Sequence, residues 1–191
     1  MERIDYKTMS DTGYLKIILG CMYSGKTSSL IRIYKYNKIA GIKTEVINYI
    51  DDNRYDPVKM STHDGIKIDC LKFKNLNELF NKESDLIEKT DSFIINEGQF
   101  FNDLYDVVNK LVNEYNKVVY VGGLDGDFKM KKFGQILDLI PISDSVEKLT
   151  AICSLCKKKA AFTKRITKET VQTMIGGADK YIPVCRNCHK I

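Results

Sequence analysis

The sequence lacks any long hydrophobic run, although 43% of its 191 residues are hydrophobic. A membrane-spanning helix needs roughly 18 consecutive apolar residues, and no stretch of the chain comes near that length. The N-terminus also lacks the apolar region of a secretory signal, because Glu2, Arg3, Asp5 and Lys7 interrupt it. We therefore expect no contact with a membrane, and a cytoplasmic protein.

Acidic residues are scarce near the C-terminus. Residues 151–191 contain nine of the 30 Lys and Arg residues but only two of the 25 Asp and Glu residues. A basic segment on a nearly neutral body favours anionic partners, either nucleic acid or the phosphates of a nucleotide. In a reducing compartment, the six cysteines indicate metal binding or free thiols rather than disulfides.

A phosphate-binding loop is predicted where the sequence reads Gly, four residues, then Gly-Lys-Thr. A strand-like apolar run precedes this segment and a helix-like run follows it, as such a loop requires. Its backbone N–H groups would surround a polyphosphate, Lys26 would reach the outer phosphates, and the Thr27 hydroxyl would ligate Mg²⁺. A turn that binds nothing is the alternative, but it has no use for Lys and Thr after the second glycine. The loop comprises Gly20, Cys21, Met22, Tyr23, Ser24, Gly25, Lys26 and Thr27.

Strand and helix signals continue along the chain after this loop. Residues 44–49 predict a second strand, and a strand-helix-strand unit implies a parallel sheet in which ligands bind beyond the carboxyl ends of the strands. Helices are predicted to begin at Asn75 and Asn102. Further strands or short apolar elements are expected at residues 66–73, 92–97, 117–122, 137–142 and 146–152.

The apolar run at residues 92–97 ends in Asn96 and Glu97. A phosphate-loop fold carries an acid at this place, at the carboxyl end of the strand beside the first strand. A primary alcohol that attacks a phosphoryl group needs a positioned proton acceptor more than a strong base, and Glu97 would leave a buried strand into a cleft. A solvated acid at the end of a strand is the alternative.

Two Cys-x-x-Cys pairs separated by 28 residues predict a tetrahedral Cys₄ zinc site. Such a site has no open position, so the zinc would be structural and would close the base of the loop at residues 157–184. Four unliganded thiols are the alternative. His189 could replace one cysteine, but we interpret it as a neighbour of the site. The predicted ligands are Cys153, Cys156, Cys185 and Cys188.

The elements together indicate an α/β fold, a phosphate-loop (RecA-like) parallel sheet flanked by helices, with a small C-terminal zinc domain. We expect a flexible N-terminal lead-in at residues 1–13. The nucleotide-binding domain would occupy residues 14–150, and the zinc domain, with a substrate-binding loop, residues 151–191.

The motifs, in their order along the chain, closely resemble the type II, zinc-containing thymidine kinases, above all the viral and animal members. The resemblance runs from about Tyr14 to Cys188, and it includes segments that ordinary phosphate-loop proteins lack. Besides the phosphate loop and the cysteine pairs, the matching segments are Asn-Glu-Gly-Gln-Phe-Phe at 96–101, Leu-Asp-Gly-Asp-Phe at 124–128, Thr-Lys-Arg at 163–165 and Gly-Gly-Ala-Asp-Lys-Tyr at 176–181.

This resemblance implies a kinase that transfers the γ-phosphate of ATP to the 5′-hydroxyl of thymidine or deoxyuridine, producing thymidine monophosphate in nucleotide salvage. It also implies structural Zn²⁺, Mg²⁺ bound with ATP, a homotetramer and feedback inhibition by thymidine triphosphate. Nucleic acid is not an expected partner.

The resemblance also assigns roles to single residues, with Glu97 as the general base. Without it, Phe101, Phe128 and Tyr181 would fit a hydrophobic core equally well. Beyond residues 20–27, the residues expected near ATP and its phosphates are Asp52, Asn53, Arg54, Asn96 and Gln99. Those expected around the nucleoside are Met22, Phe101, Leu124, Phe128, Thr163, Gln172, Thr173, Met174, Ile175, Gly176 and Tyr181.

Asn96 departs from the family pattern, which has Asp before the catalytic Glu. An Asp there usually holds Mg²⁺, often through a water molecule, and Asn keeps the carbonyl oxygen but loses the charge. We expect an active enzyme with weakened Mg²⁺ affinity, and a degenerate kinase that binds nucleotide without turnover is the alternative. A kinase with another acceptor, such as deoxycytidine or a nucleoside monophosphate, is a separate alternative. A zinc-ribbon, nucleic-acid-binding ATPase is a further alternative, although Phe162 and Tyr181 do not interleave with the basic run at 157–159 as a stacking platform would.

Overall fold

The computed structural model describes residues 12–52, 58–62, 65–82 and 84–190. The predicted lead-in at 1–13 lies outside the described residues except for Thr12 and Gly13. Six strands form one sheet in the order β5-β2-β6-β7-β1-β8, and all five of its pairings are parallel. The predicted α/β fold with a parallel sheet is confirmed. The strands are β1 (Tyr14–Gly20), β2 (Thr44–Tyr49), β5 (Leu71–Phe73), β6 (Ser92–Ile95), β7 (Val118–Gly123) and β8 (Ser145–Leu149).

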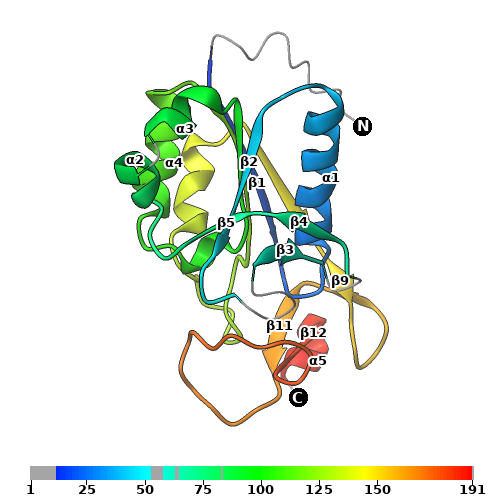
Figure 1. Cartoon of the computed structure of the whole chain (residues 1–191). Helices are drawn as coiled ribbons and strands as arrows, with labels where there is room; N and C mark the ends of the chain where they lie inside the picture. The colour runs from blue at the N-terminus through cyan, green and yellow to red at the C-terminus, as the bar shows by residue number, and fades with distance from the viewer. Residues whose placement is uncertain (1–11, 53–57, 63–64, 83, 191) are drawn as a thin grey trace.

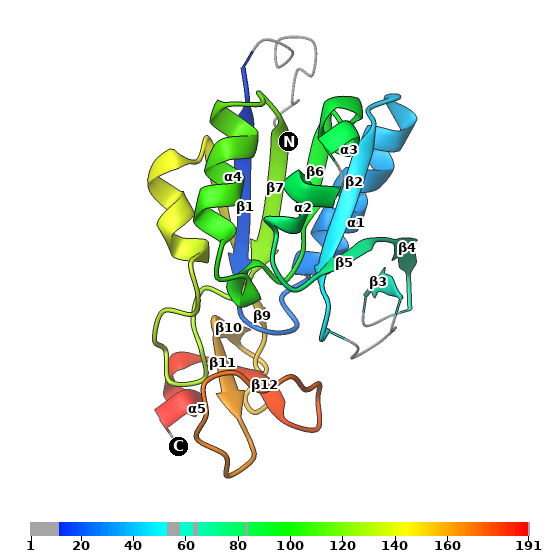
Figure 2. The same cartoon turned by 60° about the vertical axis from the view of Figure 1, so that its left-hand side comes forward.

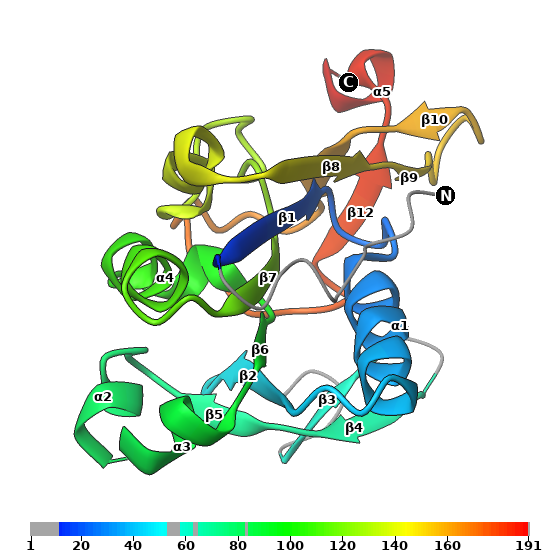
Figure 3. The same ribbon diagram turned by 90° about the horizontal axis from the view of Figure 1, so that it is seen from above.

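Helices cover both faces of this sheet (Figures 1 and 3). Neighbouring strand residues point to opposite faces, so Ile17 of β1 packs with Leu111 of α4 while Ile18 packs with Leu30 of α1. Strands buried on both faces read as continuous apolar runs, and every residue of β6 and β7 is buried. The helices are α1 (Lys26–Ile39) on one face, and α2 (Glu78–Lys82), α3 (Ser84–Lys89), α4 (Leu104–Asn113) and the 3₁₀ helix η2 (Ile136–Ile142) on the other.

Two predicted strands take a different form. Residues 66–73 divide at Cys70: β4 (Lys67–Asp69) pairs antiparallel with β3 (Lys59–Ser61) outside the main sheet, and only β5 joins the sheet. Residues 137–142 lie in η2 rather than in the sheet. Pro141 has no backbone N–H to donate to a strand ladder, which disfavours a central strand at this stretch.

Helix starts also differ from the prediction. The helix expected from Asn75 begins at Glu78, and its described residues are those of α2 and α3, on either side of residue 83, which lies outside the described residues. Asp103, and not Asn102, stands at the N-cap of α4. Its carboxylate accepts a hydrogen bond from the backbone N–H of Asn77 (2.9 Å). The side chain therefore ties two helical segments together instead of capping its own helix.

Residues 151–190, which we call the C-terminal segment, form small sheets beyond the carboxyl ends of the main strands (Figures 1 and 2). A separate apolar cluster, which contains Cys153, Ala160, Val184 and Cys188, lies at the centre of this segment. Residues 166–180, which we call the C-terminal loop, contain no helix or strand. The elements are β9 (Ala151–Ile152), β10 (Lys159–Ala160), β11 (Phe162–Arg165), β12 (Tyr181–Val184) and α5 (Arg186–Lys190).

None of the helices in the described part of the chain has the length and apolar character needed to cross a membrane.

Leu111 offers a test of the core between α4 and the sheet. Its side chain is fully buried, so we expect Leu111→Ala to destabilise the protein by about 2–5 kcal/mol through lost burial and the cavity that is left. Asn113→Ala, two positions along the same helix but exposed, should change stability by less than about 0.5 kcal/mol. Urea unfolding followed by circular dichroism measures both, and equal midpoints for the two variants would contradict this packing.

Candidate active site

The phosphate loop connects β1 to α1 through a left-handed turn. Tyr23 (φ 61°) and Gly25 (φ 86°) both have positive φ, and such turns gather backbone N–H groups into an anion-binding hollow. Gly20 has no room for a side chain, because a Cβ there would lie 2.6 Å from Leu149 O. The Nζ of Lys26 lies 2.7 Å from Cys21 O. Helix α1 begins at Lys26, so the positive end of its dipole faces the same hollow.

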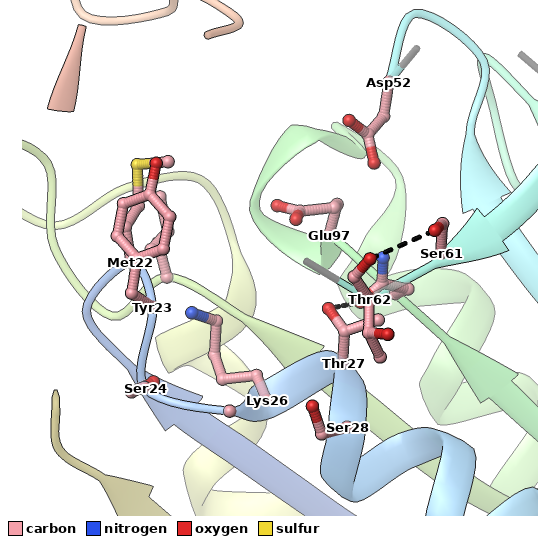
Figure 4. Close-up of a pocket in the computed structure, with 13 residues that line it drawn as sticks. Met22, Tyr23, Ser24, Lys26, Thr27, Ser28, Asp52, Ser61, Thr62 and Glu97 are labelled. Carbon is pink, nitrogen blue, oxygen red and sulfur yellow. Dashed lines mark hydrogen bonds between the residues drawn. The ribbon is translucent and has the colours of Figure 1, made fainter. Parts of the chain in front are cut away.

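A cavity of about 320 Å³ opens over this loop. In Figure 4 the Lys26 ammonium, the Thr27 hydroxyl and the Glu97 carboxylate face the same space, and Asp52 lies at its rim. An ammonium, hydroxyls and backbone N–H groups in one cavity suit a polyphosphate. The residues expected near ATP that line this cavity are Met22, Tyr23, Ser24, Gly25, Lys26, Thr27, Asp52 and Asn96.

Some residues expected near ATP do not line this cavity, and some that line it were not expected. Asn53 and Arg54 lie outside the described residues. Neither Gly20 nor Cys21 lines this cavity, because both lie in the turn beneath it. Three residues that were not predicted also line the cavity, namely Ser28, Ser61 and Thr62. Ser61 and Thr62 reach the cavity from the end of β3, a short strand outside the main sheet, so no nucleotide-binding motif marks them.

A chain of hydrogen bonds crosses the floor of the cavity. The Thr27 hydroxyl lies 3.4 Å from Asn96 Oδ1, Asn96 Nδ2 donates to Asn48 Oδ1 (3.0 Å), and Asn48 Nδ2 donates to Asp52 Oδ2 (3.2 Å). Asn48, Asn96 and Asp52 are all buried, so each polar group needs such a partner. Asn48 was not predicted; a polar residue near the carboxyl end of an otherwise apolar strand was the available signal.

Glu97 occupies a strained turn directly after β6. Its backbone is left-handed (φ 57°), which costs a non-glycine residue roughly 1–2 kcal/mol. Gln99 Nε2 donates to Glu97 Oε2 (2.6 Å), and Gln99 Oε1 accepts the backbone N–H of Leu124 (2.9 Å). Gln99 was expected near the phosphates, but it lies behind Glu97 and lines neither cavity. It fixes the orientation of the Glu97 carboxylate.

A second, smaller cavity of about 30 Å³ adjoins the first. The two cavities share Met22, Glu97 and Leu124 as wall residues. Glu97 therefore lies where they meet. The residues expected around the nucleoside that line the smaller cavity are Met22, Leu124, Phe128, Thr163, Gln172, Met174, Ile175, Gly176 and Tyr181.

Phe101 and Thr173, also expected around the nucleoside, do not line the smaller cavity. Phe101 is fully buried in the core, where its ring packs edge-on against Tyr49 (centroids 5.4 Å apart). Phe100 lines the cavity instead, together with Phe133. The 3₁₀ turn η1 (Gly98–Phe100) decides which of the two adjacent rings faces the cavity, and the sequence alone does not reveal that turn.

Arg165 organises the C-terminal loop and was not predicted. Its guanidinium donates to the carbonyl oxygens of Glu169 (2.8 Å), Val171 (2.6 Å) and Gln172 (3.1 Å). It also donates to the Tyr181 hydroxyl (2.6 Å), which itself donates to Met174 O (2.9 Å). A buried Arg that directly precedes a loop without secondary structure can satisfy the carbonyl groups of that loop.

The phosphate loop and the C-terminal segment touch each other directly. The Met22 N–H donates to Thr163 Oγ1 (3.0 Å), and the Cys21 thiol faces Ala160 O (3.5 Å). Burial raises the pKa of the Cys21 thiol, and this effect outweighs the nearby positive charge of Lys26. Cys21 is therefore a protonated packing group at this contact, rather than a reactive thiolate.

The four cysteines predicted to bind zinc come together. Their sulfur atoms all lie within 4.8 Å of one another, and Cys156 Sγ and Cys185 Sγ are 3.5 Å apart. Tetrahedral Zn–S bonds of about 2.3 Å place sulfur atoms about 3.8 Å apart, so the group could hold a metal ion. The ring of His189 lies instead by Phe128, whose carbonyl oxygen is 3.0 Å from its Nε2.

The comparisons with known proteins agree with these motifs. The sequence model of the family "Thymidine kinase" matches residues 13–189. A thymidine kinase of Oryza sativa subsp. japonica is 44% identical over 91% of this chain, which spans 65% of that protein. A thymidine kinase of Sheeppox virus (strain KS-1) is 41% identical over 94% of this chain and 98% of its own length, and one of Variola virus is 42% identical over 93% and 97%. This chain belongs to the thymidine kinase family.

Proposed function

We propose that this protein transfers the γ-phosphate of ATP to the 5′-hydroxyl of thymidine or deoxyuridine, forming the nucleoside monophosphate. The observation that carries the proposal is the position of Glu97, which lies where the phosphate-loop cavity meets the smaller, aromatic-lined cavity. A terminal phosphate in the first cavity and a hydroxyl in the second would both approach its carboxylate. The relatives described above are named thymidine kinases, which supports thymidine as the acceptor.

The first cavity would hold ATP through the phosphate loop. Lys26 and the backbone N–H groups would bind the outer phosphates, and little covalent chemistry is required beyond positioning and neutralising charge. Thr27, Asn96 and Asp52 offer only oxygen ligands, the type that Mg²⁺ prefers, so these residues would hold the ion either directly or through water. When bound, Mg²⁺ would neutralise charge on the phosphates.

Glu97 would accept the proton of the attacking hydroxyl. Gln99 fixes the carboxylate by a 2.6 Å hydrogen bond, and an oriented acceptor is what this step requires. In the smaller cavity, the rings of Phe100, Phe128 and Phe133 suit a flat pyrimidine. Met174, Ile175 and Gly176 would offer backbone groups to the edge of the base.

The four cysteines would hold a structural Zn²⁺. All four ligand positions are taken by sulfur, which leaves no open position for catalysis. The ion would join the turn after β9 to the end of β12 and to α5, and His189 connects α5 to Phe128 O. We propose that the zinc domain begins near residue 151 and that the kinase domain precedes it.

We further propose a cytoplasmic homotetramer inhibited by thymidine triphosphate, as the family resemblance implies. Association between copies is supported by β8, the last strand at one side of the sheet, and by two exposed apolar side chains there and in β9. Val146 is 45% exposed and Ile152 is 70% exposed. An open strand edge with apolar side chains favours pairing with another chain.

The nucleic-acid-binding alternative is not favoured. A single-strand binding surface needs aromatic rings on which bases can stack, but Tyr181 is buried and holds the C-terminal loop. The ring of Phe162 is covered by the Arg186 guanidinium, 4.6 Å from its centroid. Tyr181 therefore offers no free face to a base, and one face of Phe162 is already covered.

Glu97→Gln tests the general base. The amide keeps the shape and can still accept the hydrogen bond from Gln99, but it cannot take up a proton, so kcat should fall by at least about 100-fold while thymidine still binds. Glu114→Gln, an exposed position after α4, is the control and should leave kcat unchanged. Steady-state kinetics measures kcat, and calorimetry measures thymidine binding. Near-normal turnover of Glu97→Gln would reject Glu97 as the general base.

The metal site is tested by measuring the rate of phosphate transfer at increasing concentrations of free Mg²⁺. Asp52→Asn should lower activity severely, because it removes the carboxylate of the hydrogen-bonded chain at Thr27. Asn96→Asp should lower the Mg²⁺ concentration needed for half-maximal rate by adding a negative charge. Asp51→Asn, an exposed neighbour, is the control for the loss of one carboxylate.

Two outcomes of this series would change the interpretation. Identical Mg²⁺ curves for the native protein and Asn96→Asp would exclude position 96 from the metal site. If only Asn96→Asp were active, the native chain would be a degenerate kinase that binds nucleotide without turnover.

Removal of the zinc should weaken the binding of thymidine more than the binding of ATP. Cys156→Ser should abolish zinc binding and loosen the contact between His189 and Phe128, so the dissociation constant for thymidine should rise by more than that for ATP. Cys70→Ser, outside the cysteine cluster, should keep one zinc per chain. Elemental analysis of the purified proteins and calorimetric titration provide the measurements; absence of zinc from the native protein would refute the proposal.

A further inference from the structure

Asp127 is a carboxylate that the proposed reaction does not use, yet it is only 7% exposed. It lies in the loop after β7, at residues 124–133, which we call the β7 loop. Its Oδ1 accepts the backbone N–H groups of Lys129 (2.8 Å) and Lys131 (2.9 Å). One carboxylate oxygen therefore shapes the turn of the β7 loop.

The second carboxylate oxygen of Asp127 reaches the other side of the smaller cavity. Asp127 Oδ2 accepts a hydrogen bond from Gln172 Nε2 (2.8 Å), and the same amide nitrogen lies 3.2 Å from Lys132 O. A third contact in this region runs from Lys129 Nζ to Thr170 O (3.2 Å). The side chain of Gln172 thus joins the C-terminal loop to the β7 loop. Hydrogen bonds to a carboxylate are stronger than those between neutral groups.

These two loops form facing walls of the smaller cavity. The C-terminal loop contributes Met174, Ile175 and Gly176, and the β7 loop contributes Phe128 and Phe133. Arg165 holds the C-terminal loop by its backbone carbonyls, but Arg165 is itself part of the C-terminal segment. The Arg165 guanidinium also stacks on the Phe128 ring of the β7 loop, and the contact between Asp127 and Gln172 adds a hydrogen bond from the C-terminal loop to the α/β part of the molecule.

The smaller cavity has far less volume than a typical ligand site. Sites for drug-sized ligands have volumes of about 300–1,000 Å³, whereas the smaller cavity has about 30 Å³. The positions of the two loops therefore decide how much room a nucleoside finds between them. The C-terminal loop has no strand or helix of its own, so it is the wall that can move without breaking a sheet.

We propose that Asp127 and Gln172 form a clasp that holds the C-terminal loop against the β7 loop and thereby sets the affinity for the nucleoside. The inference rests on the proposed function, because it assigns the smaller cavity to the nucleoside. Asp127 itself lines the smaller cavity, but both of its carboxylate oxygens are engaged by protein N–H groups, so we assign it a positioning role through Gln172 and the backbone that follows Gln172. The clasp keeps the loop ordered beside the nucleoside, so its loss weakens nucleoside binding without changing the transfer step.

Asp127→Asn separates the two roles of this side chain. The Asn carbonyl can still accept the N–H groups of Lys129 and Lys131, so the turn is kept, but its amide nitrogen then faces the nitrogen of Gln172. A flip of the Gln172 amide would restore that bond only by turning its oxygen toward Lys132 O, so one of the two contacts is lost in either orientation. We expect KM for thymidine to rise by about 10- to 100-fold, the effect of losing a hydrogen bond to a charged group. The kcat at saturating thymidine and KM for ATP should stay within about twofold.

A reciprocal exchange tests the pair as a unit. Gln172→Glu alone sets two carboxylates against each other and should also raise KM for thymidine. The double variant Asp127→Asn/Gln172→Glu restores one donor and one acceptor in reversed positions, and it should recover most of the lost affinity. Recovery should fall short of complete because Lys132 O then has no donor. Asp138→Asn, which removes an ion pair to the side chain of Lys132 in the same loop, is the control and should leave every constant unchanged.

Hydrogen–deuterium exchange of residues 166–180 in the ligand-free protein provides a readout independent of activity. Each single variant should exchange faster there than the native protein, and the double variant should return toward native rates. A double variant that resembles the singles, or unaltered exchange in the singles, would overturn the clasp. Absence of thymidine phosphorylation in every protein would reject the proposed function, while the exchange pattern would still decide whether the clasp exists.

Discussion

The parallel arrangement of the six strands is the constraint on which the whole site depends. Because all the strands run in one direction, their carboxyl ends meet at one edge of the sheet. The phosphate loop after β1, Asp52 after β2, Glu97 after β6 and the loop after β7 are brought together there. A reversal of β6 alone would carry Glu97 to the opposite edge, away from Lys26.

Burial of polar side chains then fixes the geometry at that edge. Asn48, Asn96, Asp52 and Gln99 are all shielded from water, so each must satisfy its hydrogen-bonding groups within the protein. The resulting bonds leave few alternative orientations, which orders the floor of the larger cavity. They also hold Glu97 in a left-handed backbone conformation that an isolated chain would avoid.

The C-terminal segment forms the wall that the sheet cannot provide. A parallel sheet gives a floor and a row of loops, but the smaller cavity is also lined by residues of β11 and the C-terminal loop, which lie beyond the carboxyl ends of the main strands (Figure 2). Thr163 contacts the phosphate loop through the Met22 N–H. The Arg165 guanidinium lies 3.8 Å from the centroid of the Phe128 ring. The two parts of the chain therefore share one site.

The sequence by itself determined the α/β fold, the turn between β1 and α1 in which the predicted phosphate loop lies, Glu97 directly after its strand and the four clustered cysteines, because each depends on residues close together in the chain or on a fixed spacing. Tertiary structure decided the rest. Phe100 and not Phe101 faces the cavity because of one 3₁₀ turn, and Gln99 supports Glu97 because Leu124 lies beside it. Asn48, Asp127 and Arg165 acquire their partners only on folding, since those partners lie in other turns and strands. Contacts of this kind leave no periodicity or spacing in the sequence.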